Sequence, residues 1–115
     1  MRIEEDVKLD FSDVLIKPKR STLVSRKYAW LARQFKFKYS SHTWEGVPII
    51  AANMDHTGTY DMRASLSKHA MLTALCKFLP FEEKDNLIQT IGLDEDIKNL
   101  KPSKWVCLDV ANGYT

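Results

Sequence analysis

The sequence has few of the residues that define several common protein classes. Only two of its 115 residues are cysteines, Cys76 and Cys107, and neither lies in the paired spacing of a metal site. Such cysteines are typical of reduced thiols in a cytoplasmic protein and not of a disulfide framework. Only four glycines are present, and no GxGxxG sequence occurs, so a dinucleotide-binding Rossmann unit gains little support.

Long apolar runs and a large excess of one charge are also missing. The 17 basic and 15 acidic side chains leave a net charge of +2. No apolar run approaches the ~20 residues of a membrane helix, and the opening MRIEEDVKLD is too acidic for a signal or transit peptide. With 44% hydrophobic and 28% charged residues, the composition predicts a soluble cytoplasmic protein in which residues 1–115 form one domain. We expect no membrane partner and no bound metal.

The first half of the chain is locally basic, which raises the alternative of nucleic-acid binding. Cations recur from KPKR (17–20) to Lys38, and aromatic residues lie between them. They would bind phosphates and stack on bases. However, QFKFKYS (34–40) alternates apolar and cationic residues, which is typical of a strand with one buried and one solvated face. We therefore expect a strand around Phe35 to Tyr39 and no nucleic-acid partner.

Three short apolar runs, 47–52, 71–75 and 105–108, predict buried strands. The last run, WVCL, is predicted to be buried on both faces. Helical spacing over residues 60–70, with Thr57 or Thr59 as cap, predicts a helix after the first strand. FEEKDNLIQTIGL (81–93) predicts a second helix, with acids in its first turn and Gly92 at its end, followed by a short helix or turn over 94–100. This β-α-β-α-β order predicts a parallel sheet.

Two architectures use such units, the doubly wound sheet and the (β/α)8 barrel. A short hairpin before the first core strand suits a barrel whose lower end is plugged. We therefore predict the α/β class and, more specifically, the N-terminal part of a (β/α)8 TIM barrel with a short preceding β-hairpin. The barrel would be incomplete in this chain.

Three segments of the sequence carry a family resemblance. KLDFSDVLIKPKRSTLVSR, GVPIIAANMDHTGTYDM and VCLDVANGYT resemble, in this order, signatures of the GMP reductases in the IMP dehydrogenase/GMP reductase family. The related dehydrogenases usually carry a paired regulatory domain between the second and third core strands. The short segment between Lys77 and Trp105 has no room for it, which favours the reductases.

This resemblance implies a barrel enzyme that uses NADPH to deaminate GMP reductively to IMP and ammonia. In the family a loop cysteine attacks purine C2, ammonia leaves, and hydride from the nicotinamide reduces the covalent intermediate. The resemblance also implies a homo-oligomer, specifically a tetramer, and a potassium ion in the complete enzyme whose ligands are not in this chain.

The resemblance assigns cofactor contacts and catalytic roles to individual residues. Ser25 and Arg26 match a pair that contacts NADPH, and an arginine there could bind phosphate with two parallel hydrogen bonds. Lys77 matches a lysine near the nicotinamide that assists deamination. The cofactor-binding segment DVA consists of Asp109, Val110 and Ala111.

Lys77 and Asp109 follow strands that end on one rim, so their charged groups could pair and help protonate the leaving amine. Both are predicted to be catalytic. Asn53, Met54 and Asp55 match the strand-end motif that lines the purine site, which makes them the predicted substrate-binding residues.

Each assignment has a simpler alternative. Lys77 and Arg26 could be solvated surface groups, and Asp109 could form an Asx turn before Ala-Asn-Gly. The thiols of Cys76 and Cys107 are expected to pack in the core and not to act as nucleophiles.

The sequence also departs from the family pattern. A barrel of this type takes ~250 residues, and the cysteine loop and phosphate-binding loops would lie beyond residue 115. LCKFLP lacks the histidines that usually flank the lysine, and HTGT (56–59) replaces the more usual TVGT. We therefore expect the isolated chain to be inactive. It would function as part of a complete GMP reductase, or as a truncated protein that binds intact or complementary subunits through an open sheet edge.

Overall fold

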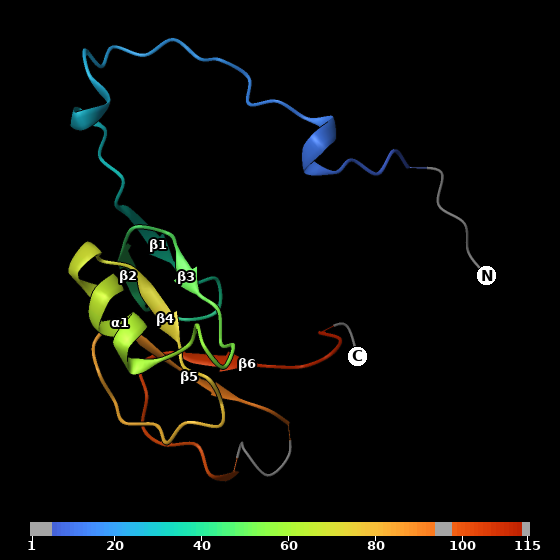
Figure 1. The fold of residues 1–115 in the computed structure, drawn as a ribbon, viewed down its shortest axis with the longest axis vertical. Helices are drawn as coiled ribbons and strands as arrows, with labels where there is room; N and C mark the ends of the chain where they lie inside the picture. Colours follow the sequence, from blue (N-terminus) through green and yellow to red (C-terminus); the bar gives the residue numbers. More distant parts are fainter. Residues whose placement is uncertain (1–5, 94–97, 114–115) are drawn as a thin grey trace.

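The computed structural model describes residues 6–93 and 98–113 and contains two sheets (Figure 1). The smaller sheet is the antiparallel hairpin β1-β2, and the larger is a four-stranded parallel sheet in the order β3-β4-β5-β6. The elements are the 3-10 turns η1 (Phe11–Asp13), η2 (Arg26–Tyr28) and η3 (Ser67–His69), the helix α1 (Tyr60–Leu66), and the strands β1 (Arg33–Lys36), β2 (Thr43–Gly46), β3 (Ile50–Ala51), β4 (Leu72–Ala74), β5 (Leu87–Ile91) and β6 (Val106–Leu108).

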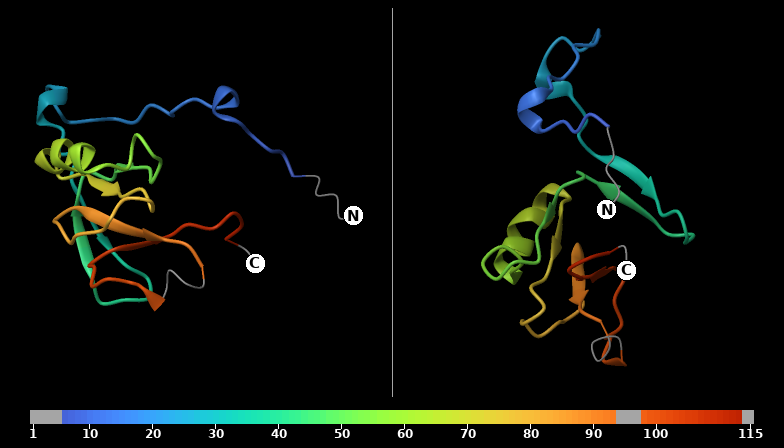
Figure 2. Two further views of the ribbon diagram at one scale, coloured as in Figure 1. Left: turned by 60° about the horizontal axis from the view of Figure 1, so that its bottom comes forward. Right: turned by 90° about the vertical axis from the view of Figure 1, so that its right-hand side faces the viewer.

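Residues 6–32 form an extended arm that projects away from the two sheets (Figures 1 and 2). Its only regular elements are η1, which begins with a reciprocal cap between Asp10 and Asp13, and η2. The apolar side chains of Phe11 and Ile16 are 95% and 96% exposed. The radius of gyration, 18.1 Å, exceeds the ~13 Å expected of a compact chain of this length. The arm therefore adds little to the core.

The hairpin confirms the predicted strand in the basic region, although it begins and ends earlier than expected. β1 pairs with β2 in a register that places Phe35 opposite Trp44, and the two rings stack at 5.8 Å. Phe37, just after β1, stacks on Trp105 at 4.8 Å. The expected buried face is only half covered, since Phe35 and Phe37 remain 41% and 44% exposed. Their rings attach the hairpin to one face of the parallel sheet.

The core lies on the two faces of β4 and β5. On the hairpin side, Leu72, Ala74 and Ile88 pack together with Trp105 and Cys107 against them. On the opposite side, a second cluster is formed by Leu75, Phe81 and Leu87 with Tyr60 of α1. The sheet is therefore covered by the hairpin on one face and by α1 on the other (Figure 2).

The predicted helix over residues 60–70 is confirmed, and its cap is Thr59. The Thr59 hydroxyl accepts a hydrogen bond from the Met62 backbone N–H at 3.1 Å. α1 continues into η3, which ends at Ala70 in the left-handed conformation (φ 53°). This turn leads the chain directly into β4.

The predicted helix over residues 81–93 is wrong. The structure has β5 there, and all five of its residues are buried. Asn86, in the left-handed conformation (φ 59°), redirects the chain just before the strand. β5 then pairs with β4 on one side and β6 on the other, and three of its residues are β-branched. The sheet thus has one more strand than predicted, and part of the expected short helix over 94–100 lies outside the described residues.

The connection from β4 to β5, residues 75–86, contains no helix, although a parallel crossover usually does. Side chains of α1 hold it in place instead. The Tyr60 hydroxyl donates to the Pro80 carbonyl at 2.7 Å and accepts from the Glu82 N–H at 2.9 Å. Arg63 Nε donates to the Asp85 carbonyl at 2.7 Å. These bonds fix the loop against α1 on the side of the sheet where a crossover helix would lie.

β6 is not buried on both faces as predicted. Val106 and Leu108 are 45% and 51% exposed, and within the described residues β6 is an edge strand that pairs with β5 alone. The α/β class with a parallel sheet and a preceding hairpin is confirmed, and within the described residues the sheet is open at β3 and β6. None of the helices in residues 6–93 and 98–113 combines the length and apolarity needed to cross a bilayer.

Candidate functional site

Five of the predicted site residues lie at one rim of the parallel sheet. Asn53, Met54 and Asp55 follow β3, Lys77 follows β4, and Asp109 follows β6. The strands are parallel and in register, so their carboxyl ends meet at the same edge. In open α/β sheets this edge is where ligands usually bind. The rim is therefore the candidate site.

The turn after β3 builds one side of the rim. The Met54 carbonyl accepts from the N–H groups of Thr57 at 3.0 Å and Gly58 at 2.7 Å. The Gly58 carbonyl then accepts from the Cys76 N–H at 2.8 Å, which fixes the turn against the end of β4. A Cβ atom at Gly58 would lie 2.3 Å from the Ala74 carbonyl oxygen, so this approach requires glycine. Residues 54–57 line a hollow of about 380 Å³ beside the turn.

A side-chain bond links the ends of β3 and β4. Cys76 Sγ donates to Asp55 Oδ1 at 3.4 Å. Cys76 is only 4% exposed, whereas Asp55 is exposed. The buried thiol therefore orients the carboxylate from the interior of the protein. Both cysteines are free thiols, and the buried Cys76 fits the predicted packing role better than that of a nucleophile.

Lys77 and Asp109 share the rim but do not contact each other. β5 lies between the strands that they follow. Lys77 Nζ is 5.4 Å from the ring centroid of Phe78, and the Asp109 N–H donates to the Ile91 carbonyl at 2.8 Å. Among the described residues no ion pair joins Lys77 to Asp109, so the predicted pairing is absent from this structure. Both side chains are exposed and accessible to a ligand.

Ser25 and Arg26 are not brought to the rim. Ser25 caps η2 by accepting a hydrogen bond from the Lys27 N–H at 3.5 Å. Arg26 is exposed, and this turn lies on the arm, away from the strand ends (Figure 1). Val110 and Ala111, the other predicted cofactor contacts, directly follow Asp109; Val110 is half-buried and Ala111 is exposed.

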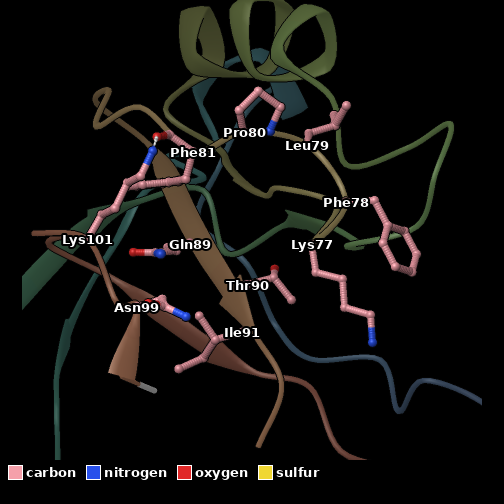
Figure 3. Close-up of a pocket in the computed structure, with 10 residues that line it drawn as sticks. All are labelled: Lys77, Phe78, Leu79, Pro80, Phe81, Gln89, Thr90, Ile91, Asn99 and Lys101. Carbon is pink, nitrogen blue, oxygen red and sulfur yellow. Dashed lines mark hydrogen bonds between the residues drawn. The ribbon is translucent and has the colours of Figure 1, made fainter. Parts of the chain in front are cut away.

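Sequence reasoning missed two buried polar residues in β5. Gln89 and Thr90 are each 7% exposed, and neither Gln89 Oε1 nor Thr90 Oγ1 has a hydrogen-bond partner. Both line a cavity of about 460 Å³ that also includes Lys77 (Figure 3). They were missed because the segment was predicted to be helical. The β-branched residues on either side of Gln89 and Thr90 were the available signal.

The fold and the rim define an α/β protein with polar residues at the carboxyl edge of its parallel sheet. Comparison with known proteins shows which α/β proteins the chain resembles. The chain is 49% identical to a GMP reductase of Buchnera aphidicola subsp. Acyrthosiphon pisum, 48% to one of Salmonella paratyphi C and 47% to one of Shigella flexneri serotype 5b. Each alignment covers the whole of this chain. No protein-family model matches it. The resemblance to GMP reductases is thereby confirmed.

The similarity covers only part of each relative. The chain spans 39% of the length of each of these relatives. The alignments extend over 135 residues, more than the 115 of the chain, so the relatives have residues in this stretch that have no counterpart here.

Proposed function

We propose that the chain forms part of a GMP reductase, an oxidoreductase that uses NADPH to convert GMP to IMP and ammonia. The observation that supports this most is the 47–49% identity, over the whole chain, to proteins that bear this name. In this proposal the chain is one segment of a (β/α)8 barrel in a cytoplasmic homo-oligomer. NADPH supplies the hydride that reduces the purine.

The rim residues would have distinct roles in this reaction. The exposed ammonium group of Lys77 would protonate the leaving amine, and Asp109, with Val110 and Ala111, would contact the cofactor. Asn53, Met54 and Asp55 would contact the purine. The Asp55 carboxylate is already oriented by Cys76, which lowers the entropy lost when a ligand binds.

The groups at the rim fit such a cofactor in part. A cation and a carboxylate are accessible there, as a nicotinamide nucleotide would need. Ser25 and Arg26 are proposed to bind cofactor phosphate, but their turn would first have to approach the rim from the arm. The cysteine nucleophile belongs to none of the described elements, because Cys76 is buried and Cys107 lies within β6.

A chimera tests the proposal directly. The matching segment of a Salmonella GMP reductase is replaced by this chain, and GMP-dependent oxidation of NADPH is followed by absorbance, with IMP identified by chromatography. We expect turnover by the chimera and none by the isolated chain. Lys77→Ala in the chimera should slow turnover by about 10²–10⁴-fold, the usual contribution of a positioned proton donor.

Lys68→Ala is the matched control, since Lys68 is an exposed lysine in η3, at the opposite end of β4 from Lys77. It should leave turnover unchanged. A folded chimera without activity would contradict the proposed function, and equal effects of the two substitutions would remove Lys77 from the reaction.

A second candidate function is a non-catalytic protein that binds intact or complementary GMP reductase subunits. The open sheet favours it, because Ile50 in β3 and Leu108 in β6 are 56% and 51% exposed at its two edges. Unpaired strands of this kind invite pairing with another chain. Size-exclusion chromatography of the chain mixed with an intact relative would detect a stable complex. Separate elution at micromolar concentrations would eliminate this candidate.

A further inference from the structure

One segment of the arm, residues 14–32, combines positive charge with exposed apolar side chains, and we call it the basic segment. It contains no acidic residue, and the acids of the first 44 positions all lie within residues 1–13. Its basic residues, all exposed, are Lys17, Lys19, Arg20, Arg26 and Lys27. Five cations without an acid give the basic segment a charge of +5, whereas the whole chain carries +2. The positive charge of the arm is therefore concentrated in this segment.

The apolar side chains of the basic segment are exposed as well. Leu15 and Ile16, directly before the first of its cations, are each 96% exposed, and Val24 is 95% exposed. Tyr28 and Trp30 add two aromatic rings that are 62% and 74% exposed. Single apolar residues on a surface need no explanation, but several in one place mark a surface for another protein or a membrane. The basic segment therefore has two properties, cations and apolar side chains, that a partner must match.

The place of the basic segment in the fold makes it accessible to a large partner. It belongs to the arm, which projects away from the two sheets (Figures 1 and 2). Residues 14–25 form no helix or strand. Their backbone N–H and C=O groups would be unpaired in the hydrocarbon core of a bilayer, which is costly. Contact with lipid would therefore be made at the level of the headgroups, where water still bonds the backbone.

The aliphatic side chains distinguish between the two polyanionic partners that a basic segment could bind. Single-stranded nucleic acids bind through cations and stacking on aromatic rings, and Leu15, Ile16 and Val24 offer no ring for a base to stack on. At a bilayer surface, in contrast, aliphatic and aromatic side chains enter the boundary between headgroups and acyl chains. Lysines and arginines are attracted to anionic lipids. An anionic bilayer therefore matches both properties of the segment.

We propose that the basic segment binds the surface of an anionic lipid bilayer, with its cations at the headgroups and Leu15, Ile16 and Val24 at the acyl boundary. Binding at a surface needs no spanning helix. The lack of a long apolar run, on which the expectation of no membrane partner depends, therefore does not oppose it. The proposal rests on the arm alone and is independent of the proposed reaction. Arg26 has a proposed role in cofactor binding, so the test uses other cations.

Flotation of the chain with lipid vesicles tests the proposal. One set of vesicles is pure phosphatidylcholine, and the other contains about 30% phosphatidylserine, which gives the bilayer a negative surface potential. We expect the chain to bind the anionic vesicles at least about tenfold more tightly, with an affinity that falls as sodium chloride is raised. Soluble glycerophosphoserine, which supplies the headgroup without a bilayer, should not displace the chain, and displacement would overturn the bilayer as the partner.

Two arm variants separate the two properties of the segment. Lys17→Gln, Lys19→Gln and Arg20→Gln combined remove three charges and should weaken binding to anionic vesicles about a hundredfold, since each cation near such a surface contributes about fivefold. Leu15→Ser and Ile16→Ser combined keep every charge and remove apolar side chains, and should weaken binding about tenfold.

The matched control removes the same charge outside the arm. Lys68→Gln, Lys98→Gln and Lys104→Gln combined replace exposed lysines, and like the triple arm variant they lower the net charge from +2 to −1. This variant should change the affinity by less than about twofold, because the attraction falls off within a Debye length of the bilayer. Equal losses in the two triple variants would mean that only the net charge matters, which would overturn the assignment to the basic segment.

Circular dichroism checks that each variant is folded, which we expect because the substituted arm residues are exposed and belong to neither core cluster. Lack of binding of the folded chain to anionic vesicles, or unchanged affinity in either arm variant, would overturn the proposal. Single-stranded RNA is the probe for the other polyanion. Retention of the chain on RNA at a salt concentration that releases it from anionic vesicles would assign the segment to nucleic acid and overturn lipid binding.

Discussion

At the residue scale, Gly58 decides whether the rim can form. Its carbonyl is bonded to the Cys76 N–H, and a Cβ atom there would lie within 3 Å of three backbone atoms, those of Ala52, Ala74 and Cys76. None of these is a flexible side-chain end that could move aside cheaply. The position therefore tolerates no side chain without a shift of β3 or β4.

We predict that Gly58→Ala lowers the free energy of unfolding by about 1–3 kcal/mol, the usual cost of overpacking. Gly113→Ala is the matched control, because the nearest atom to its Cβ would be Val110 Cγ2 at 4.0 Å. Urea denaturation followed by tryptophan fluorescence measures both. Equal stability of the two variants would mean that the turn after β3 is looser than the structure describes.

The positions of the rim residues were largely predictable from the sequence. Asn53, Asp55 and Asp109 each follow a short apolar run, and parallel strands place such positions at one edge. The bond between Cys76 and Asp55 was not predictable, because it depends on the precise position of the turn around Gly58. The same is true of Ser25 and Arg26, whose place relative to the rim has no local signal in the sequence.

At the element scale, the loop from β4 to β5 is held in place by hydrogen bonds to α1. A connection of this kind usually contains a helix that packs on the sheet by itself. Tyr60 is the centre of this arrangement. Its hydroxyl both donates to Pro80 and accepts from Glu82, and its ring packs on the cluster of Leu75, Phe81 and Leu87. The hydroxyl bonds and the ring contact can be separated by substitution.

Tyr60→Phe should therefore keep the packing and lose both hydrogen bonds. We predict a loss of about 1 kcal/mol in the free energy of unfolding, since the bonds are partly solvated. We also predict faster amide hydrogen exchange confined to residues 79–86. Tyr39→Phe is the control, because Tyr39 is 89% exposed. Loss of protection throughout β4 and β5 would show that the loop and the sheet unfold together, contrary to this prediction.

The missed strand β5 and the wrongly predicted burial of β6 show what limits prediction of elements from the sequence. α1 was predictable because a cap and helical spacing agree. β5 was not, because FEEK supplies the acidic first turn of a helix and Gln89 interrupts the apolar run. β6 was correctly predicted as a strand, but its burial depends on a neighbour, which its own residues do not specify.

At the scale of the whole molecule, much apolar surface is exposed. The arm exposes Phe11, Leu15 and Ile16, and the sheet exposes Ile50 and Leu108 at its edges. The arm and the sheet edges could each associate with another molecule. Association through the sheet edges is more favourable than association through the arm, because an edge strand offers unpaired backbone groups in addition to apolar side chains.

We predict that the isolated chain associates in a concentration-dependent way through β6. A lysine at an edge strand opposes pairing by its charge and solvation. Leu108→Lys should therefore shift the chain toward the monomer in light scattering coupled to size-exclusion chromatography. Leu15→Lys is the control, since this equally apolar side chain is 96% exposed and belongs to the arm, which extends away from the sheet (Figure 1). If Leu15→Lys abolishes association and Leu108→Lys does not, the arm and not the sheet edge is the surface through which the chain associates.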